Sequence, residues 1–386
     1  MNRRLQFAVF FSIVIALYSV LNSYIFIRGW EVASTIPGLR LWYTIVYLIL
    51  AFSFLAGRFL ERVSLNWFSH ALVWIGSFWL AEFAYLYLTL LAIDILRLAN
   101  HLIPLFPAWI MTHAVEAKQL TALAVLGSTI AVIIAGHINA IRPRVRKLEI
   151  TIPKNGRTLK SVDIVAASDI HLGTVIGRSR LEKIVAKINA LAPDIVLFPG
   201  DVFDEDIGSV IKQNLGETLR TIKAPYGVYS CTGNHEYIGG VEPAVKYLTD
   251  HGITVLRDTA VRIADSFTLA GREDLAMKQF DGTRRKPLPE VLANVDKNLP
   301  LILLDHQPMR LDEAVENGVD LQLSGHTHHG QIWPFSYITK KMYEVSWGYK
   351  KKGNTHFYVS SGVGTWGPPV RTGNTPEIVQ INLNFA

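Results

Sequence analysis

The stretch DIVLFPGDVFD (residues 194–204) decides the fold. Its first half is a continuous apolar run, which is typical of a strand buried on both faces of a sheet. Gly200 and Asp201 follow this run directly. Because loops at the carboxyl ends of strands bind the ligands of α/β sheets, Asp201 is a candidate functional residue. The stretch therefore predicts an α/β domain with a functional edge.

Similar runs on both sides of this stretch extend the prediction. VDIVAAS (162–168) and YGVYSCTG (226–233) predict buried strands, and SRLEKIVAKINALA (179–192) has helical spacing. Further helices are expected at 207–222, 241–252 and 310–318, further strands at 301–306, 320–325, 356–362 and 377–384, and a hairpin at 259–271. The last strands lack intervening helices, so we expect an α/β (α+β) sandwich of mixed sheets flanked by helices.

The apolar residues are concentrated in the first part of the 386-residue chain. A bilayer crossing takes about 20 residues, and four apolar segments are long enough: 5–27, 39–60, 71–93 and 120–141. The sequence therefore predicts a four-helix transmembrane region with a basic exit (1–147) and a soluble domain (148–386).

Basic residues indicate the orientation of the spans. Arg3 and Arg4 precede the first span, and RPRVRK (142–147) follows the fourth. This bias predicts that both termini and the soluble domain are cytoplasmic. The apolar loop 97–111 is expected to be interfacial or re-entrant, and a fifth crossing there would invert the orientation.

The acidic residue Glu82 falls within the third predicted span, and Asp94 lies at its end. A polar lipid or ion site at Glu82 and a hydrogen bond within the bundle are both open interpretations. The net charge of +6 belongs to the first 147 residues, and the soluble part is close to neutral. No nucleic-acid partner is therefore expected. Cys231, the single cysteine, excludes an internal disulfide and a cysteine-based zinc site.

Potential metal ligands gather at the ends of the predicted strands. They occur in five short motifs: SDIH with Asp169 and His171, PGDVFD with Asp201 and Asp204, GNHE with Asn234, His235 and Glu236, DH with Asp305 and His306, and GHTHHG with His326, His328 and His329. Oxygen and nitrogen donors without thiolate suit divalent Mn, Fe or Zn. The set is larger than one ion needs, which favours a two-metal site for displacement at phosphorus.

These motifs, read in order as SDIH, GD, GNHE, H and GHTH, resemble those of the calcineurin-like metallophosphoesterase superfamily. The flanking sequences are similar to those of a membrane-anchored bacterial branch of this superfamily. They are DIVLFPGDVFD, APYGVYSCTGNHEY and DLQLSGHTHHGQIWPF. The resemblance covers about residues 148–386 and implies a metallophosphoesterase domain with two divalent metal ions.

The resemblance also implies a role for each matching residue. It assigns Asp169, His171 and His328 to one metal, Asn234, His306 and His326 to the other, and Asp201 to both as a bridge. His235 is implied as the catalytic acid toward the leaving oxygen. Asp204 and Glu236 are candidates for orienting a histidine or the Asn234 loop. His329 departs from the glycine frequent in relatives and is expected at the rim or behind the ligands, not as a metal ligand. Arg371 is expected either at substrate phosphate or at the surface.

The expected function is a dinuclear metal-dependent phosphoric ester hydrolase anchored in the membrane. Its two divalent ions are expected to be Mn, Fe or Zn. Its substrate would be a phosphate ester, phosphodiester or pyrophosphate, lipid-linked or close to the bilayer, as the anchor raises the local concentration of such molecules. The segments QIWPFSYI and GVGTWGPPV are expected either to admit acyl chains or to be packed loops.

Two other functions compete with this hydrolase. One is a catalytically silent membrane scaffold or sensor, and the other is a transport bundle regulated by the soluble domain. The complete set of matching ligands argues against the scaffold, and the unbroken spans argue against transport. The expected location is the bacterial inner membrane, with the catalytic domain cytoplasmic and the oligomeric state left open.

Overall fold

The computed structural model describes residues 3–386, with the side chains of residues 3–8 and 10 left outside this description. The orientation argument from Arg3 and Arg4 therefore stays a sequence-based prediction. The chain forms two compact units, Met1–Ala135 and Gly136–Ala386. The division falls within a long helix, whereas the sequence predicted a boundary at residue 147.

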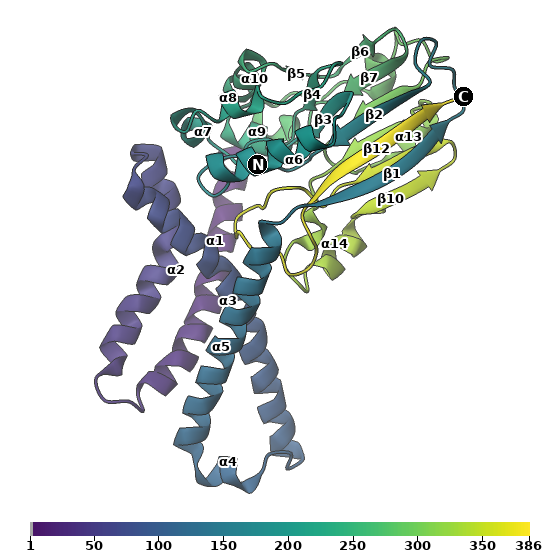
Figure 1. Ribbon diagram of the computed structural model, residues 1–386. Helices are drawn as coiled ribbons and strands as arrows, with labels where there is room; N and C mark the ends of the chain where they lie inside the picture. The colour runs from purple at the N-terminus through teal and green to yellow at the C-terminus, as the bar shows by residue number, and fades with distance from the viewer. Residues whose placement is uncertain (1–2) are drawn as a thin grey trace. The chain divides into compact units, whose positions relative to one another are not determined.

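The first unit is helical (Figure 1). Its elements are α1 (Arg3–Ala33), α2 (Leu39–Val63), α3 (Trp67–Leu102), α4 (Ala108–Thr112) and α5 (Ala114–Ala140), the last of which continues into the second unit. Four of them are long and apolar enough to cross a membrane: Phe11–Ala33 within α1, then α2, α3 and α5. With five residues, α4 is too short for a fifth crossing, which needs about 20.

A glycine and a hydrogen bond between helices hold the helices of this unit together. A side chain at Gly76 would meet the backbone of Phe54, so glycine lets α2 and α3 approach closely. Glu82 on α3 accepts a 2.5 Å hydrogen bond from the Thr129 hydroxyl on α5. The structure thus supports a hydrogen bond within the bundle, one of the two interpretations of Glu82.

The second unit contains two six-stranded mixed sheets. The first has the order β1-β12-β2-β3-β4-β5, and the second has the order β10-β11-β9-β8-β7-β6. The strands are β1 (Arg144–Ile152), β2 (Ser161–Ala166), β3 (Ile195–Pro199), β4 (Val228–Cys231), β5 (Ile253–Val255), β6 (Thr259–Ile263), β7 (Phe267–Gly271), β8 (Leu301–Leu304), β9 (Leu321–Ser324), β10 (Gly348–Lys352), β11 (Thr355–Val359) and β12 (Glu377–Phe385).

Helices connect and cover these sheets. They are α6 (Arg178–Ala190), α7 (Gly208–Lys212), α8 (Leu215–Leu219), α9 (Asn234–Gly239), α10 (Val241–Asp250), α11 (Met277–Phe280), α12 (Leu288–Val291), α13 (Leu311–Glu316), the 3-10 turn η1 (His328–Gly330) and α14 (Ser336–Met342). The predicted sandwich of mixed sheets with outer helices is confirmed, as is the hairpin, formed by β6 and β7.

Two local predictions were wrong or incomplete. The single helix predicted at 207–222 is two short helices, because Asn214 between them adopts a left-handed φ of 51°. The basic exit RPRVRK runs into an unpredicted strand, β1, which pairs in parallel with β12 (Figure 1). Its charged residues concealed an edge strand whose inward side chains, Ile150 and Ile152, are buried.

The core lies between the two sheets. Side chains from the first sheet, such as Ile164 and Leu197, belong to the same buried cluster as Leu269 and Leu323 of the second. A separate cluster covers the outer face of the second sheet, where Leu311 and other residues of α12 and α13 are buried. Continuous apolar strands thus form a double layer whose carboxyl edges carry the site.

Candidate metal centre

The motif residues adopt strained backbone conformations at the ends of the strands. Asp169, His171 and Asp201 each have a φ of 53°, and His326 and His328 have φ values of 70° and 43°. Residues other than glycine rarely adopt the left-handed region, and such strain is often found at functional sites. Here it turns the chain sharply after each strand, so that side chains from distant motifs converge.

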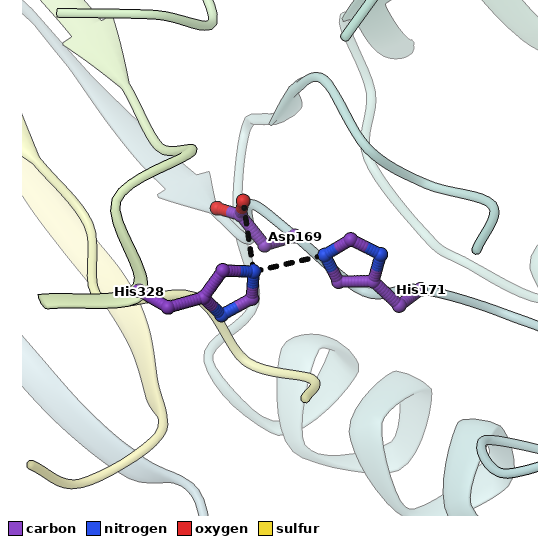
Figure 2. A group of neighbouring side chains, drawn as sticks. All are labelled: Asp169, His171 and His328. Atoms are coloured by element: carbon purple, nitrogen blue, oxygen red, sulfur yellow. Dashed lines mark hydrogen bonds and ion pairs between the residues drawn. The ribbon is translucent and has the colours of Figure 1, made fainter. Parts of the chain in front are cut away.

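The first group of converging side chains is Asp169, His171 and His328 (Figure 2). The Nε2 atoms of the two imidazoles lie 2.9 Å apart, and Nε2 of His328 lies 3.5 Å from Oδ1 of Asp169. All three side chains are buried. Residues from the loop after β2 and from η1, after β9, therefore meet as three potential ligands.

The second group is Asp201, His306 and His326, accompanied by Asn234. Nε2 of His306 lies 3.0 Å from Oδ2 of Asp201. The amide oxygen of Asn234 lies 2.8 Å from Nδ1 of His326 and 3.2 Å from Nε2 of His306. The Nδ1 of His306 donates to the Pro199 carbonyl over 2.8 Å, which leaves Nε2 available as a ligand.

Asp201 lies between the two groups. Its Oδ2, next to His306 in the second group, is also 3.9 Å from Nε2 of His171 in the first. Its Oδ1 accepts a 2.9 Å hydrogen bond from the backbone N–H of His235. One carboxylate is therefore within reach of both ligand groups.

Glycines in the motifs permit this close approach. A Cβ at Gly200 would meet the ring of His306, one at Gly233 would meet the carboxylate and backbone of Asp201, and one at Gly325 would meet Ser168 and Asp169. Each of these three glycines thus faces a residue of another motif. Glycine therefore precedes Asp201, Asn234 and His326 at positions where a side chain would clash with a neighbouring motif.

Burial favours the neutral, metal-binding form of two candidate ligands, His171 and His326, by lowering their pKa. Burial, with the charge of His235, lowers the pKa of His171 to about 3, and burial with the charge of His306 lowers that of His326 to about 4. Burial opposes ionisation of Asp201, but the charge of His306 holds its pKa well below the usual range. A neutral imidazole and an ionised carboxylate are what a divalent cation requires.

His235 lies beside the first group. Its Nδ1 contacts the backbone oxygen of Asp204, and its ring centroid lies 4.6 Å from that of His171 and 6.0 Å from that of Trp366. Burial lowers its pKa, but the charges of Asp201 and Asp204 outweigh this effect and raise it overall. The ring is thus oriented at the site's edge and favours its protonated form.

Asp204 and Glu236 support the loops around the site. Oδ1 of Asp204 lies 3.6 Å from Nδ1 of His171. The Glu236 carboxylate accepts hydrogen bonds from the backbone N–H groups of Asp201, Phe203 and Gly233, at 3.1, 3.1 and 2.7 Å. Glu236 therefore ties the loop after β3 to the loop after β4.

Arg371 does not lie at the surface, one of its two expected positions. Its side chain is fully buried and donates hydrogen bonds to the carbonyls of Gly362 and Gly364 and, over 2.6 Å, to Oδ1 of Asn374. Its Nη2 lies 3.2 Å from Nδ1 of His328. Instead of reaching solvent, the guanidinium contacts the ring of His328, a candidate ligand.

Asn374 and Ser168 were missed by the sequence analysis. The amide of Asn374 donates to the His328 carbonyl, and the Ser168 hydroxyl donates to Oδ2 of Asp169. The signal for Asn374 in the sequence is weak: it is a polar residue that follows a glycine. His329, expected at the rim or behind the ligands, is buried, and its Nδ1 lies 3.1 Å from the Ser346 hydroxyl.

The residues present fit a pair of divalent cations. Two groups of histidine and carboxylate donors converge, all buried except the half-buried His326, with ligand atoms within 4.8 Å in each group, and one carboxylate lies between them. Nitrogen and oxygen donors of this kind suit Mn, Fe or Zn, and the identity of the metals follows from neither group alone.

Comparisons with known proteins give the relatives of this chain. A family model described as "Calcineurin-like phosphoesterase" matches residues 162–330. An "Uncharacterized metallophosphoesterase" from Helicobacter pylori is 36% identical over 245 residues, 63% of this chain and 64% of the relative. Another from Aquifex aeolicus is 34% identical over 249 residues, 64% of this chain and 94% of the relative.

A eukaryotic relative has a name that also mentions a membrane. The "Transmembrane protein with metallophosphoesterase domain" of Danio rerio is 33% identical over 279 residues, 69% of this chain and 63% of the relative. The match thus spans less than two thirds of the Helicobacter and Danio proteins. With a nearly complete match to the Aquifex relative and a family model over the motif region, the chain belongs to the calcineurin-like metallophosphoesterase family.

Proposed function

We propose that this protein is a membrane-anchored, two-metal phosphoesterase. It would hydrolyse a phosphate ester, phosphodiester or pyrophosphate bond of a lipid-linked or membrane-proximal substrate. The observation that carries the proposal is the position of the Asp201 carboxylate, 3.0 Å from Nε2 of His306 and 3.9 Å from Nε2 of His171. A shared carboxylate between two ligand groups is the arrangement that a two-metal hydrolase needs.

In this proposal, Asp169, His171 and His328 hold one ion, and Asn234, His306 and His326 hold the other. Asp201 is a ligand of both. When bound, two such ions supply activation of a water molecule and neutralise charge on the phosphoryl oxygens.

His235 is the proposed proton donor to the leaving oxygen. Its Nδ1 is engaged by the Asp204 carbonyl, so the second ring nitrogen is the one left to hold a transferable proton. Asp201 accepts from the backbone N–H of His235 over 2.9 Å, which couples the position of this ring to that of the shared carboxylate.

The four candidate spans support anchoring in a membrane. From the basic exit after the last span, we propose the bacterial inner membrane with the catalytic unit in the cytoplasm. A reporter fused to Ala386 tests this orientation. Activity of a reporter that works only outside the cytoplasm would reverse the assignment.

Purified full-length protein in detergent tests the enzymatic proposal. With Mn²⁺, it should hydrolyse at least one member of a panel of lipid phosphates, pyrophosphates and aryl phosphodiesters, and Asp201→Asn and His235→Ala should be strongly impaired. His251→Asn is the matched control, since His251 lies outside all candidate ligand groups and contacts the Tyr247 carbonyl. Equal activity in all four proteins would remove the proposal and favour a silent scaffold.

A further inference from the structure

An exposed apolar face lies on and before α14 in the second unit. We call it the α14 face, and its residues are Trp333, Phe335, Tyr337, Ile338 and Met342. The exposed fractions of Tyr337, Ile338 and Met342 are 60%, 54% and 66%. Single exposed apolar residues are ordinary, but five of them within ten positions form a patch that indicates an interaction site.

The helix geometry explains why these side chains stay outside the core. Ile338 and Met342 are four residues apart and share one side of α14, next to Tyr337. Ser336, at the start of the same helix, is buried and faces the domain. The side of α14 that faces away from the domain therefore carries the large apolar side chains, and the side that faces the domain carries Ser336.

Charge and aromatic content suit the boundary of a bilayer. Lys340 and Lys341 are exposed on the same short helix, and Nζ of Lys340 lies 5.8 Å from the centre of the Tyr337 ring. Tryptophan and tyrosine favour the boundary between headgroups and acyl chains, and lysines attract anionic headgroups. A membrane surface with anionic lipid complements both properties.

Hydrogen bonds connect the α14 face with the end of the last candidate span. Within the second unit, Asn139 in the last turn of α5 donates to the carbonyls of Arg371 and Asn374, at 2.8 and 2.7 Å. The neighbouring Thr372 accepts a 3.0 Å hydrogen bond from the backbone N–H of Trp333 through its hydroxyl. A span that ends at Ala140 would reach the membrane boundary there, and this connection would hold Trp333 close to that boundary.

We propose that the α14 face rests in the headgroup region of the bilayer that holds the helical region, with a preference for anionic lipids. The face would dip about 5–10 Å into the boundary of headgroups and acyl chains, as amphipathic helices do. The second unit is thereby fixed at the membrane surface by its own side chains, in addition to its covalent link to α5.

This contact also bears on the substrate. The Gln331 side chain donates to the carbonyl of Trp366 over 3.0 Å, and the Trp366 ring lies next to His235. A face seated in the lipid would therefore place this edge of the metal centre at headgroup level, where the phosphate of a lipid-linked substrate lies. This second step rests on the proposed function, whereas the membrane contact itself does not.

A depth-sensitive label on the full-length chain tests the contact. Ile338→Cys is compared with Ile211→Cys on α7, since the two isoleucines are 54% and 53% exposed. The native Cys231 is 1% exposed, so the unmutated chain serves as the blank for labelling. Each labelled protein is reconstituted into vesicles of phosphatidylcholine and phosphatidylglycerol that contain a doxyl-lipid quencher.

We expect severalfold stronger quenching of the label at position 338 than at position 211. Quenching at 338 should weaken when phosphatidylglycerol is omitted and in Lys340→Gln/Lys341→Gln. Quenching at 338 as weak as at 211 would overturn the proposal, including the case in which a protein partner covers the face.

Turnover separates this inference from the proposed function. Ile338→Asp should lower hydrolysis of a lipid phosphoester in vesicles severalfold and leave hydrolysis of a soluble aryl phosphoester unchanged. An inactive protein whose label is still quenched would refute the enzymatic proposal alone. Equal loss on both substrates would refute the role of the face in reaching lipid substrates.

Discussion

Oδ2 of Asp201 lies 3.0 Å from Nε2 of His306, although the two residues follow strands of different sheets. The sandwich brings the carboxyl ends of β3 and β8 together, and Gly200, which has a φ of 80°, leaves room for the His306 ring. This pair thus brings together candidate ligands that follow the two different sheets.

Metal content distinguishes the shared ligand from an unshared one. Purified wild-type protein loaded with Mn²⁺ should hold about two ions per chain. His328→Asn removes a ligand of one group and should retain about one ion, whereas Asp201→Asn weakens both groups and should retain less than one. Plasma mass spectrometry measures these ratios, and a full complement in Asp201→Asn would contradict the bridging role.

Leaving-group dependence tests His235. A general acid contributes about 10²–10⁴-fold to rate, and its loss matters least when the leaving group needs no proton. His235→Ala should therefore lose far more kcat with an alkyl phosphoester than with a nitrophenyl phosphoester, while its metal content stays that of wild type. An equal loss with both esters would argue for a role in positioning instead.

Space at Gly233 is a third test of the centre. Its φ of −112° suits any residue, so the cost of Gly233→Ala is purely steric and falls on Asp201. We expect about 10–100-fold weaker Mn²⁺ binding, the range seen when groups that orient a ligand are disturbed. Titration of the metal-free protein measures it. Gly127→Ala, whose new methyl group meets open space, should bind like wild type.

Arg371 should matter for stability. Arg371→Met leaves the buried carbonyls of Gly362 and Gly364 without their donor, at a cost of about 2–4 kcal/mol. Hydrogen exchange in β2 and β11 reports this loss in the full-length protein. The exposed Arg262, paired with Asp265 at 3.0 Å, is the control, and Arg262→Met should cost less than about 0.5 kcal/mol. Similar exchange in both variants would contradict a structural role for Arg371.

The decrease in the free energy of unfolding at acidic pH tests whether His171 is buried. Burial, with the nearby charge of His235, lowers its pKa from 6.5 to about 3, so the unfolded chain binds a proton below pH 6.5 that the folded metal-free protein resists. This contribution is complete above pH 6.5 and is lost as the pH falls toward 3.

The measurement compares metal-free wild type with His171→Asn. Between pH 6.5 and 4.5, wild type should lose about 1–3 kcal/mol more stability than the variant, from 1.36 kcal/mol per pKa unit. Other buried acids, such as Asp169 with its raised pKa, are present in both proteins and cancel in the difference. Parallel pH profiles by hydrogen exchange would show that His171 is not buried in the folded state.

Much of the domain was predictable because its signals are local. Apolar runs such as 194–199 identify buried strands, and a polar residue directly after such a run lies at the carboxyl edge wherever the strand is placed. The edge strand β1 escaped prediction because it carries charged side chains on its exposed face, and α7 and α8 were merged because the left-handed turn at Asn214 leaves no apolar signal.

By itself, the sequence determined the four apolar helices, the alternating strands and helices, and the types of ligand at the strand ends, because these depend on the order of residues along short segments. The tertiary structure alone decided that Arg371 is buried behind His328 and that the side chains of α14 face outward, and it brings Asp201 between two ligand groups, as the motif resemblance implied. These properties depend on the packing of two sheets and on loops far apart in the chain, so no local pattern carries them.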